Sequence, residues 1–279
     1  MIEKHCFVIP NYNGALFISK TLRKAIDAET GEIIVVDDNS NDESIPIIKK
    51  FPVSLICRTE NGGFAAAVNS GLREAKSRGF IYASIMNSDV ELPDGFANSM
   101  REVIGNLNNN NAIAVAGFVE SGTKRYFTND KISGFFFTIK MDIIESVGFL
   151  NEEFFMYGEE TEFFRRVINK GFKIVQTGIE LRHFGEKSSS PAIDSSWYAI
   201  RNSILIDFIQ TSYLSALKTI VILFLIINKL YKPRGSNDDP SYIRVKRVGV
   251  KTGNYYLIKA IYWNIKRIFA KTQGDNSWK

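Results

Sequence analysis

The first 90 residues alternate between two hydrophobic periods. Short runs of β-branched and other apolar residues, each bounded by Asn, Gly, Asp or Pro, predict strands at residues 5–10, 32–36, 53–57 and 82–86. The segments between them carry apolar residues at helical spacing and predict helices at residues 15–27, 44–51 and 64–78. Because strands that alternate with helices form βαβ units, we expect an α/β domain with a mostly parallel sheet.

The pattern is less regular after Asp89. Further strands are predicted at residues 113–119, 135–139 and 172–176, and further helices at residues 141–147 and 160–170. Gly148 and Gly171 follow these two helices, where glycine is a favoured stop. The polar residues 106–111 are interpreted as a loop.

The chain changes character near residue 212. Residues 213–231 are strongly apolar, but the uninterrupted core at 219–227 is far shorter than the roughly 20 residues that cross a bilayer. After a loop at 233–240, residues 254–271 place six apolar residues on one helical face: Leu257, Ile258, Ile261, Ile265, Ile268 and Phe269. This pattern is typical of a helix in a membrane interface, and the alternative is a helix packed on the core or on a second subunit. We expect a domain at 1–210 and a basic, amphipathic helical extension at 211–279.

Charge divides the chain at the same point. The first 210 residues carry 22 Lys and Arg against 27 Asp and Glu, whereas the remainder carries thirteen against three. An acidic body with a basic, aromatic-rich tail indicates attachment to an anionic surface, either lipid or nucleic acid. No signal peptide is expected from the first residues, so a cytoplasmic location is predicted. With two Cys and two His in the sequence, no zinc-type cluster is expected.

Polar residues follow the predicted strands at the sheet edge where α/β proteins bind ligands. Asp37 and Asp38 follow the second strand and could accept the N3–H of a pyrimidine base; the alternative is a helix cap plus a loop charge. Asn87-Ser88-Asp89 follows the fourth strand. Its carboxylate, with Asp37 and Asp38 in reach, could hold Mg²⁺ or Mn²⁺ together with phosphate oxygens, although Asn and Asp are also common in turns.

Small residues open the third helix, from Asn61-Gly62-Gly63-Phe64 to Gly71. Small side chains allow a diphosphate or sugar to approach the backbone N–H groups at the positive end of a helix. Close packing of this helix on the sheet would require the same residues, so both interpretations stay open.

Three carboxylates cluster at Glu159, Glu160 and Glu162, beside an aromatic, otherwise apolar stretch. Like charges repel and resist desolvation, so the cluster predicts a catalytic rim where a polar partner, a metal or a reacting hydroxyl gathers. The alternative is a helix N-terminus, where the helix dipole favours acidic residues.

In order and spacing, these motifs resemble those of the family 2 glycosyltransferases, which have a GT-A fold, over roughly residues 5–205. Residues 8–13 are similar to the family's nucleotide-contacting first strand, and residues 35–42 to its base-binding Val-Asp-Asp-x-Ser-x-Asp. Asn61-x-Gly63-Phe64 and Asn69-x-Gly71 match the donor-side helix start. Asn87-Ser88-Asp89 stands at the Asp-x-Asp metal motif, in the form seen in rhamnosyltransferase-like members with Asn-Pro-Asp.

The segment 148–160 resembles the family's Gly-Gly-Phe-Asp-Glu-x-Phe-Phe-x-Tyr-x-Glu-Asp, whose last Asp is the general base of inverting members. Glu160 occupies that position here, and Glu159 is the neighbouring candidate. His183 resembles the family's His near the metal and diphosphate. Trp197-Tyr198 and Arg201-Asn202 resemble residues of lipid-linked sugar transferases, where the arginine could bind a phosphate in a bidentate manner.

The resemblance implies a mixed, mostly parallel GT-A (Rossmann-like) sheet flanked by helices. It implies inverting, metal-dependent transfer of a sugar from dTDP-rhamnose or a UDP-hexose to a glycan or polyprenyl-diphosphate-linked acceptor. It assigns catalysis to Glu160 and Glu159, and the Mg²⁺ or Mn²⁺ site to Asp89 and His183. Donor binding falls to Pro10, Tyr12, Asn13, Asp37, Asp38, Asn61, Gly63, Phe64, Asn69, Asn87 and Ser88, and acceptor or phosphate binding to Tyr157, Arg166, Trp197 and Arg201.

The resemblance also implies which anionic surface, lipid or nucleic acid, the basic extension would bind. It implies peripheral attachment to the cytoplasmic face of the inner membrane in cell-surface polysaccharide synthesis, with no nucleic-acid partner, and it leaves a homo-oligomer possible. Two other functions stay open. A sugar-phosphate nucleotidyltransferase also binds sugar nucleotides on a parallel sheet, although the first strand here runs into Asn11-Tyr12-Asn13 instead of a glycine-rich triphosphate loop. A non-catalytic surface scaffold with the same fold is the other alternative.

Overall fold

The computed structural model describes residues 4–28, 31–107, 111–120, 123–125, 134–183, 195–233 and 240–272. The chain divides into two compact units. The first comprises residues 1–152 and 159–190, and the second comprises residues 153–158 and 191–279. Each unit has its own apolar core, so each is described separately below.

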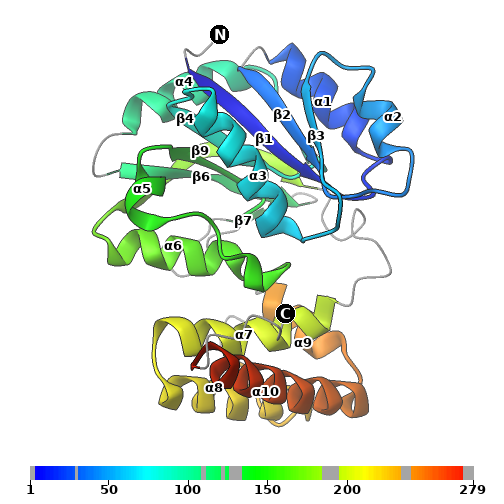
Figure 1. Ribbon diagram of the computed structural model, residues 1–279, viewed down its shortest axis with the longest axis vertical. Coiled ribbons are helices and arrows are strands. Elements are labelled where there is room, and N and C mark those ends of the chain that lie inside the picture. Colours follow the sequence, from blue (N-terminus) through cyan, green and yellow to red (C-terminus); the bar gives the residue numbers. More distant parts are fainter. Residues whose placement is uncertain are drawn as a thin grey trace. The chain divides into compact units, whose positions relative to one another are not determined.

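The described residues of the first unit form a nine-stranded mixed sheet in the order β3-β2-β1-β4-β8-β6-β9-β5, with β7 paired to β6 (Figure 1). The first four strands in this order are all parallel, and β8 runs antiparallel between β4 and β6. The strands are β1 (His5–Asn11), β2 (Glu32–Asp37), β3 (Ser54–Cys57), β4 (Tyr82–Met86), β5 (Val90–Glu91), β6 (Asn111–Glu120), β7 (Thr123–Arg125), β8 (Phe136–Lys140) and β9 (Lys173–His183).

Helices cover both faces of this sheet (Figure 1). Side chains alternate between the faces of a strand, so Val8 of β1 joins the core under one set of helices and Phe7 joins the other. The first set is α3 (Phe64–Ser77), α5 (Ile143–Val147) and α6 (Glu159–Asn169). The second is α1 (Ile18–Asp27), α2 (Ser44–Ile48) and α4 (Phe96–Asn106). A 3₁₀ turn, η1 (Glu152–Phe154), precedes α6.

The predicted elements of the first 90 residues agree with the structure to within three residues at each end. Gly148 and Gly171 follow α5 and α6 with φ of +83° and +87°, as expected of helix-terminating glycines. The sequence pattern missed β5, β7 and α4. β5 and β7 have two and three residues, too few for a periodic signal, and α4 begins after Gly95 without a side-chain cap.

Four helices make up most of the second unit: α7 (Ser195–Gln210), α8 (Tyr213–Ile227), α9 (Pro240–Arg247) and α10 (Val250–Thr272). Their core joins Ile200 of α7 to Leu223 of α8, Val245 of α9 and Leu257 of α10. α7, which lies before the predicted domain boundary at residue 210, packs with the later helices and belongs to this unit. None of the helices described here is both long enough and apolar enough to cross a membrane.

In α10 the buried face differs from the predicted one. Leu257 and Ala260 face the core, but so do Asn264 and Arg267, while Ile258, Ile265 and Phe269 are exposed. The pattern had grouped Leu257 with the exposed residues. Arg267 is buried because it forms an ion pair inside the unit, and hydrophobic periodicity does not report ion pairs.

Candidate active site

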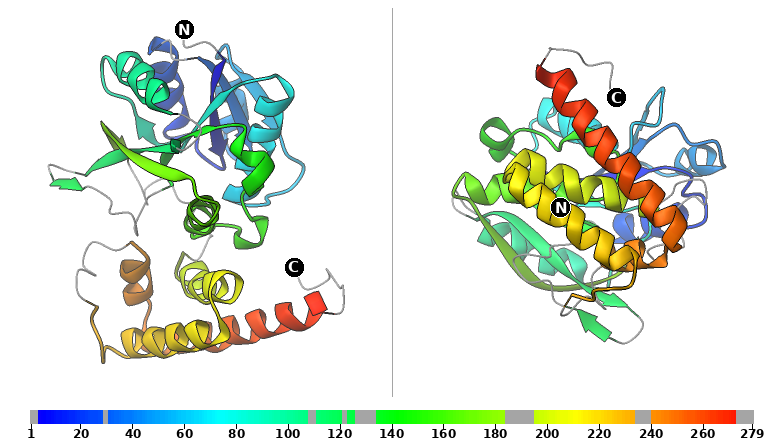
Figure 2. Two further views of the ribbon diagram at one scale, coloured as in Figure 1. Left: turned by 90° about the vertical axis from the view of Figure 1, so that its left-hand side faces the viewer. Right: turned by 90° about the horizontal axis from the view of Figure 1, so that it is seen from below.

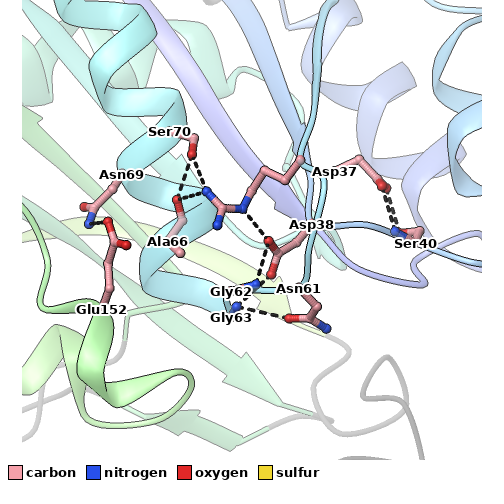
Figure 3. Close-up of polar contacts among 11 residues, drawn as sticks. Asp37, Asp38, Ser40, Asn61, Gly62, Gly63, Ala66, Asn69, Ser70 and Glu152 are labelled. Atoms are coloured by element: carbon pink, nitrogen blue, oxygen red, sulfur yellow. Dashed lines mark hydrogen bonds and ion pairs between the residues drawn. The ribbon is translucent and has the colours of Figure 1, made fainter. Parts of the chain in front are cut away.

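Asp37 and Asp38 are buried at the carboxyl end of β2, and the protein uses both carboxylates itself (Figure 3). Asp37 accepts hydrogen bonds from Asn11 Nδ2 at 2.8 Å, from Ser40 N at 2.8 Å and from Ser40 Oγ at 2.6 Å. These bonds join the ends of β1 and β2, since Asn11 and Asp37 are register partners.

Asp38 holds the glycine turn before α3. Its carboxylate accepts from Gly62 N at 3.2 Å and Gly63 N at 2.8 Å, and Arg58 Nε lies 2.7 Å away (Figure 3). Burial raises the pKa of Asp38 above its usual value, against the opposing effects of these N–H groups and of Arg58. Arg58, which the sequence analysis missed, is itself held by Ser70 Oγ at 2.8 Å. A direct hydrogen bond from Asp37 or Asp38 to a base stays a prediction.

The loop after β1 carries the predicted donor residues Tyr12 and Asn13, and Pro10 is buried within β1. Asn13 has φ of +51°, and it exchanges bonds with the next loop: its N–H donates to Ser40 Oγ, and its Oδ1 accepts from Asn41 N. A Cβ on Gly14 would lie 2.2 Å from Asn11 Oδ1 and 3.3 Å from Ser88 Oγ. The loops after β1 and β4 therefore meet at Gly14, which brings Ser88 beside the first-strand residues.

Small residues at the start of α3 were expected either to admit a ligand to the backbone N–H groups or to allow close packing on the sheet, and the structure is compatible with both. Gly63 caps the helix with φ of +84° and donates its N–H to Asn61 Oδ1 at 3.0 Å (Figure 3). Ala65, Ala66 and Ala67 are buried, and a Cβ on Gly71 would lie 2.3 Å from Val8 Cγ1. Close packing on the sheet therefore accounts for the small residues after Phe64, whereas Asn61 and Gly63 lie at the positive end of the helix.

Asn69 has a different role from the predicted donor contact. Its Nδ2 donates to Glu152 Oε1 at 2.8 Å (Figure 3). The same Nδ2 donates to Leu150 O at 2.9 Å, and Oδ1 accepts from Leu150 N at 3.0 Å. The side chain is buried and both of its amide hydrogens are used. Asn69 thus anchors residues 150–152, which lead toward the acidic cluster.

Asp89 and His183, the two predicted metal ligands, lie next to each other. Strands β5 and β9 pair antiparallel, with Val90 opposite His183, and His183 Nε2 lies 3.0 Å from Asp89 Oδ1. Asn87 Nδ2 is 3.3 Å from the same nitrogen, and the ring of Phe135 stacks on the imidazole at a centroid distance of 5.0 Å. Asp89 is buried, so its carboxylate is held in one place.

Asp37 and Asp38 do not join this pair, contrary to the prediction. Strand β1 separates β2 from β4, so the two carboxylates lie two strands away from Asp89. In the described part of the chain, no three His, Cys, Asp or Glu side chains come together as a metal-binding group.

The acidic cluster lies in the first turn of α6. Glu159 and Glu162 are buried, at 4% and 1% exposure, whereas Glu160 is partly exposed. A Cβ added to Gly134 would lie 2.8 Å from both Cβ and Cγ of Glu160, so Glu160 packs directly on Gly134. A side chain larger than glycine at 134 would displace Glu160.

Gly134 and Phe135 bring the acidic helix and the Asp89–His183 pair together. Gly134 contacts Glu160, while Phe135 stacks on His183 and accepts a hydrogen bond from Asn87 N at 2.9 Å. This follows from topology, because β8 runs antiparallel to β4 and its first residues meet the end of β4. Residues distant in sequence thus converge on two consecutive residues that were not among the predicted site residues.

The two predicted phosphate-binding arginines, Arg166 and Arg201, both donate hydrogen bonds to oxygen atoms of the protein. Arg166 Nε donates to Glu162 Oε1 at 2.7 Å and Arg166 Nη2 to Phe149 O at 2.8 Å, so it ties α6 to the preceding loop. Arg201 is buried in the second unit and donates to Glu153 O and Phe154 O. In that unit Arg244 lies over Tyr157, and Trp197 lies beneath Lys259.

The amino-acid sequence matches the family model described as glycosyl transferase family 2 over residues 6–172. An uncharacterized glycosyltransferase of Rickettsia prowazekii is 33% identical over 116 residues, which are 40% of this chain and 35% of that protein. A dolichol-phosphate mannosyltransferase of Pyrococcus furiosus is 31% identical over 106 residues, 36% of this chain and 29% of that protein. The chain therefore spans only 29% to 35% of the length of these two relatives.

Solved structures show the same fold. A mannosyltransferase of Pyrobaculum calidifontis, in complex with GDP-Man and Mn²⁺, superposes with a TM-score of 0.60 at 16% identity. The match covers 94% of this chain and 87% of that one. The predicted GT-A fold is confirmed.

Proposed function

The chain belongs to glycosyl transferase family 2, and from this premise we propose that it transfers a sugar from a nucleoside diphosphate donor to an acceptor hydroxyl, with inversion at the anomeric carbon. The observation that carries this proposal is the convergence of Glu160 and the Asp89–His183 pair on Gly134 and Phe135. Such a reaction needs one group near the leaving diphosphate and another near the attacking oxygen, and this arrangement offers both.

The group formed by Asn87, Asp89 and His183 fits a divalent cation. It offers a carboxylate, an imidazole and an amide oxygen, and Asn87 Oδ1 is buried without a hydrogen-bond partner in the described structure. In this proposal, diphosphate oxygens and water complete the shell of a Mg²⁺ or Mn²⁺ ion. A cation bound there would neutralise charge on the departing diphosphate.

Glu160 is the proposed general base. A base must reach the proton that it removes, and Glu160 is partly exposed whereas Glu159 is buried. Glu160 takes the proton of the acceptor hydroxyl as that oxygen bonds to the anomeric carbon. The bond from the anomeric carbon to the diphosphate oxygen breaks in the same displacement, and the configuration inverts.

The proposed donors are dTDP-rhamnose and UDP-hexoses. Asn87-Ser88-Asp89 supports the first through its likeness to the rhamnosyltransferase-like motif, and a solved structure of S. aureus TarS that shares the fold, in complex with UDP-GlcNAc, supports the second. The proposed acceptor is a glycan on a polyprenyl diphosphate. The name of the Pyrococcus relative, a dolichol-phosphate mannosyltransferase, supports a lipid-linked acceptor.

A panel of nucleotide sugars tests the proposed function. Slow donor hydrolysis with Mn²⁺ or Mg²⁺ is expected for one or two members of the panel, and chelation should abolish it. Pyrophosphate release from a nucleoside triphosphate would support the nucleotidyltransferase instead. No hydrolysis and no binding of any donor would support the non-catalytic scaffold.

The second unit supports attachment to an anionic membrane surface. α10 exposes Tyr255, Ile258, Tyr262, Ile265 and Phe269, each between 43% and 69% exposed, and these recur at helical spacing along one stripe. α8 exposes Leu214, Leu217, Val221 and Phe224 in a second stripe. The end of α8 meets the beginning of α10, where Asn228 and Asn254 hydrogen-bond to each other (Figure 2). Lys259 and Lys266 flank the stripe of α10, and lysine beside apolar residues suits an interface with anionic lipid.

We expect Ile258→Glu to weaken vesicle binding at least about tenfold, because it replaces an inserted apolar side chain with a charge of the same sign as the lipid. The measurement is co-flotation with vesicles of anionic and of neutral phospholipid. Ile81→Glu, the same change at an exposed position of the first unit, is the matched control and should bind as the unchanged protein does. Failure of the unchanged protein to float with anionic vesicles would instead indicate that a second copy covers these stripes.

A further inference from the structure

Residues 153–158 comprise the last two residues of η1 and the turn that leads from it to α6, and they belong to the helical second unit. We name them the acid-helix loop, because Gly158 is bonded to Glu159, the first residue of the helix that carries Glu160. Both flanks of the loop lie in the first unit, where Asn69 holds Glu152 and Phe163 anchors α6 in the core. A short segment held by one unit therefore leads directly into the proposed base of the other.

The acid-helix loop is strained. Phe155 and Tyr157 have φ of +60° and +66°, and Gly158 follows at +96°. For a bulky side chain, the left-handed region costs on the order of 1–3 kcal/mol per residue, so such a conformation persists only where other contacts impose it. The loop would not keep this shape by its own preference.

Two neighbouring residues of α7 impose the shape. Arg201 Nη2 donates to Glu153 O at 2.8 Å and to Phe154 O at 2.7 Å. Asn202 Nδ2 lies 3.1, 2.8 and 2.6 Å from the carbonyl oxygens of Phe154, Met156 and Tyr157. Two buried side chains thus fix four of the six carbonyl groups of the loop.

Side chains of α7, α9 and α10 make further contacts with the acid-helix loop. Glu153 forms ion pairs with Arg267 at 2.6 Å and Lys271 at 2.5 Å, in a largely buried position. The rings of Phe155 and Tyr198 stack with their centroids 5.0 Å apart. The guanidinium carbon of Arg244 lies 3.8 Å from the centroid of the Tyr157 ring. Three helices therefore contact the six residues of the loop and fix its conformation.

We propose that the second unit is a positioning element for Glu160, acting through the acid-helix loop. The contacts with α7, α9 and α10 fix the conformation of the loop and therefore the position at which α6 begins. Because Glu160 is the second residue of α6, they also fix the orientation of its side chain beside Gly134. Arg201, Asn202 and Arg267 are positioning residues and do not touch substrate. The inference rests on the proposed transferase activity, and it gives the helical unit a catalytic role separate from membrane attachment.

Arg267→Glu tests the inference, because it places a negative charge against Glu153. We expect kcat to fall about 10- to 100-fold, with the KM for donor changed less than about twofold, since small misplacement of a catalytic group costs rate more than binding. Lys251→Glu also reverses a charge, on the exposed side of α10, and should leave kcat unchanged. Arg267→Lys keeps the ion pair and should restore most of the rate.

The assay uses the full chain without vesicles, so that lipid binding does not enter. Thermal melting checks that each variant is folded, and Arg267→Gln replaces Arg267→Glu if the latter is unfolded. Hydrogen exchange of residues 153–160 should be faster in the slow variant than in the unchanged protein, and it should be unchanged in Lys251→Glu. Normal kcat and unchanged exchange in folded Arg267→Glu would overturn the positioning role, whereas absence of turnover in the unchanged protein would count against the transferase activity itself.

Discussion

Glu160→Gln is expected to lower turnover by about 10²–10⁴-fold, the usual contribution of a general base, while donor binding stays nearly unchanged. Glutamine keeps the size of the side chain and its contact with Gly134 but cannot accept the proton of the acceptor hydroxyl. The measurement is steady-state transfer to a glycan acceptor, with donor affinity measured separately by calorimetry. A loss in kcat with an unchanged donor Kd is the expected signature.

Two further substitutions make this result specific. Glu159→Gln should have a much smaller effect on kcat, because Glu159 is 4% exposed and does not reach a bound acceptor. Glu102→Gln, on the exposed surface of α4, controls for the loss of a charge and should be indistinguishable from the unchanged protein. If Glu159→Gln is the slow variant and Glu160→Gln is not, the base is Glu159.

Asp89→Asn is expected to reduce turnover by about 100- to 1,000-fold. A cation opposite a departing diphosphate contributes several kcal/mol to the stability of the transition state, and a neutral amide in place of this carboxylate weakens its binding. Mn²⁺ affinity in the presence of nucleoside diphosphate, followed by electron paramagnetic resonance, should fall in parallel. The substitution also removes the charge that faces His183 at 3.0 Å.

Asp94→Asn is the matched control for Asp89→Asn. Asp94 lies five residues further along, and its carboxylate forms an exposed ion pair with Lys24 at 3.4 Å, which contributes little to stability. Turnover and Mn²⁺ affinity should both be unchanged in this variant. Full activity of Asp89→Asn at low Mn²⁺ would remove Asp89 from the site.

The elements of the first 90 residues could be predicted because their signal is local. Strand β2 is a run of Ile and Val that ends at Asp37, and α3 carries apolar residues at helical spacing after Gly63. Hydrophobic period and turn residues are properties of neighbouring positions, so a single sequence contains them. The same reasoning failed for β5, whose two residues depend on pairing with β9.

Residue type and position led to a predicted chemistry for the site but could not give the contacts of its residues. Asp89, His183 and Glu160 were selected from their motifs, and the structure brings them around Gly134 and Phe135, which no motif had marked. Arg166 and Arg201 were predicted to bind a phosphate, but in the structure they donate hydrogen bonds to backbone carbonyl groups. An arginine that binds a phosphate and one that holds backbone carbonyls look alike in sequence, because only the fold decides what lies within reach of the guanidinium.

Local sequence established the order of strands and helices, the acidic body with its basic tail, and a set of carboxylates suited to sugar transfer. Folding established which of these groups meet: β8 returning beside β4 places Gly134 near the Asp89–His183 pair, and α7, α9 and α10 hold the loop that leads into α6. The division has a physical cause. Periodicity and turn chemistry act between neighbours in the chain, whereas ion pairs, close approaches and strained loops depend on residues tens or more than a hundred positions apart, which only packing brings together.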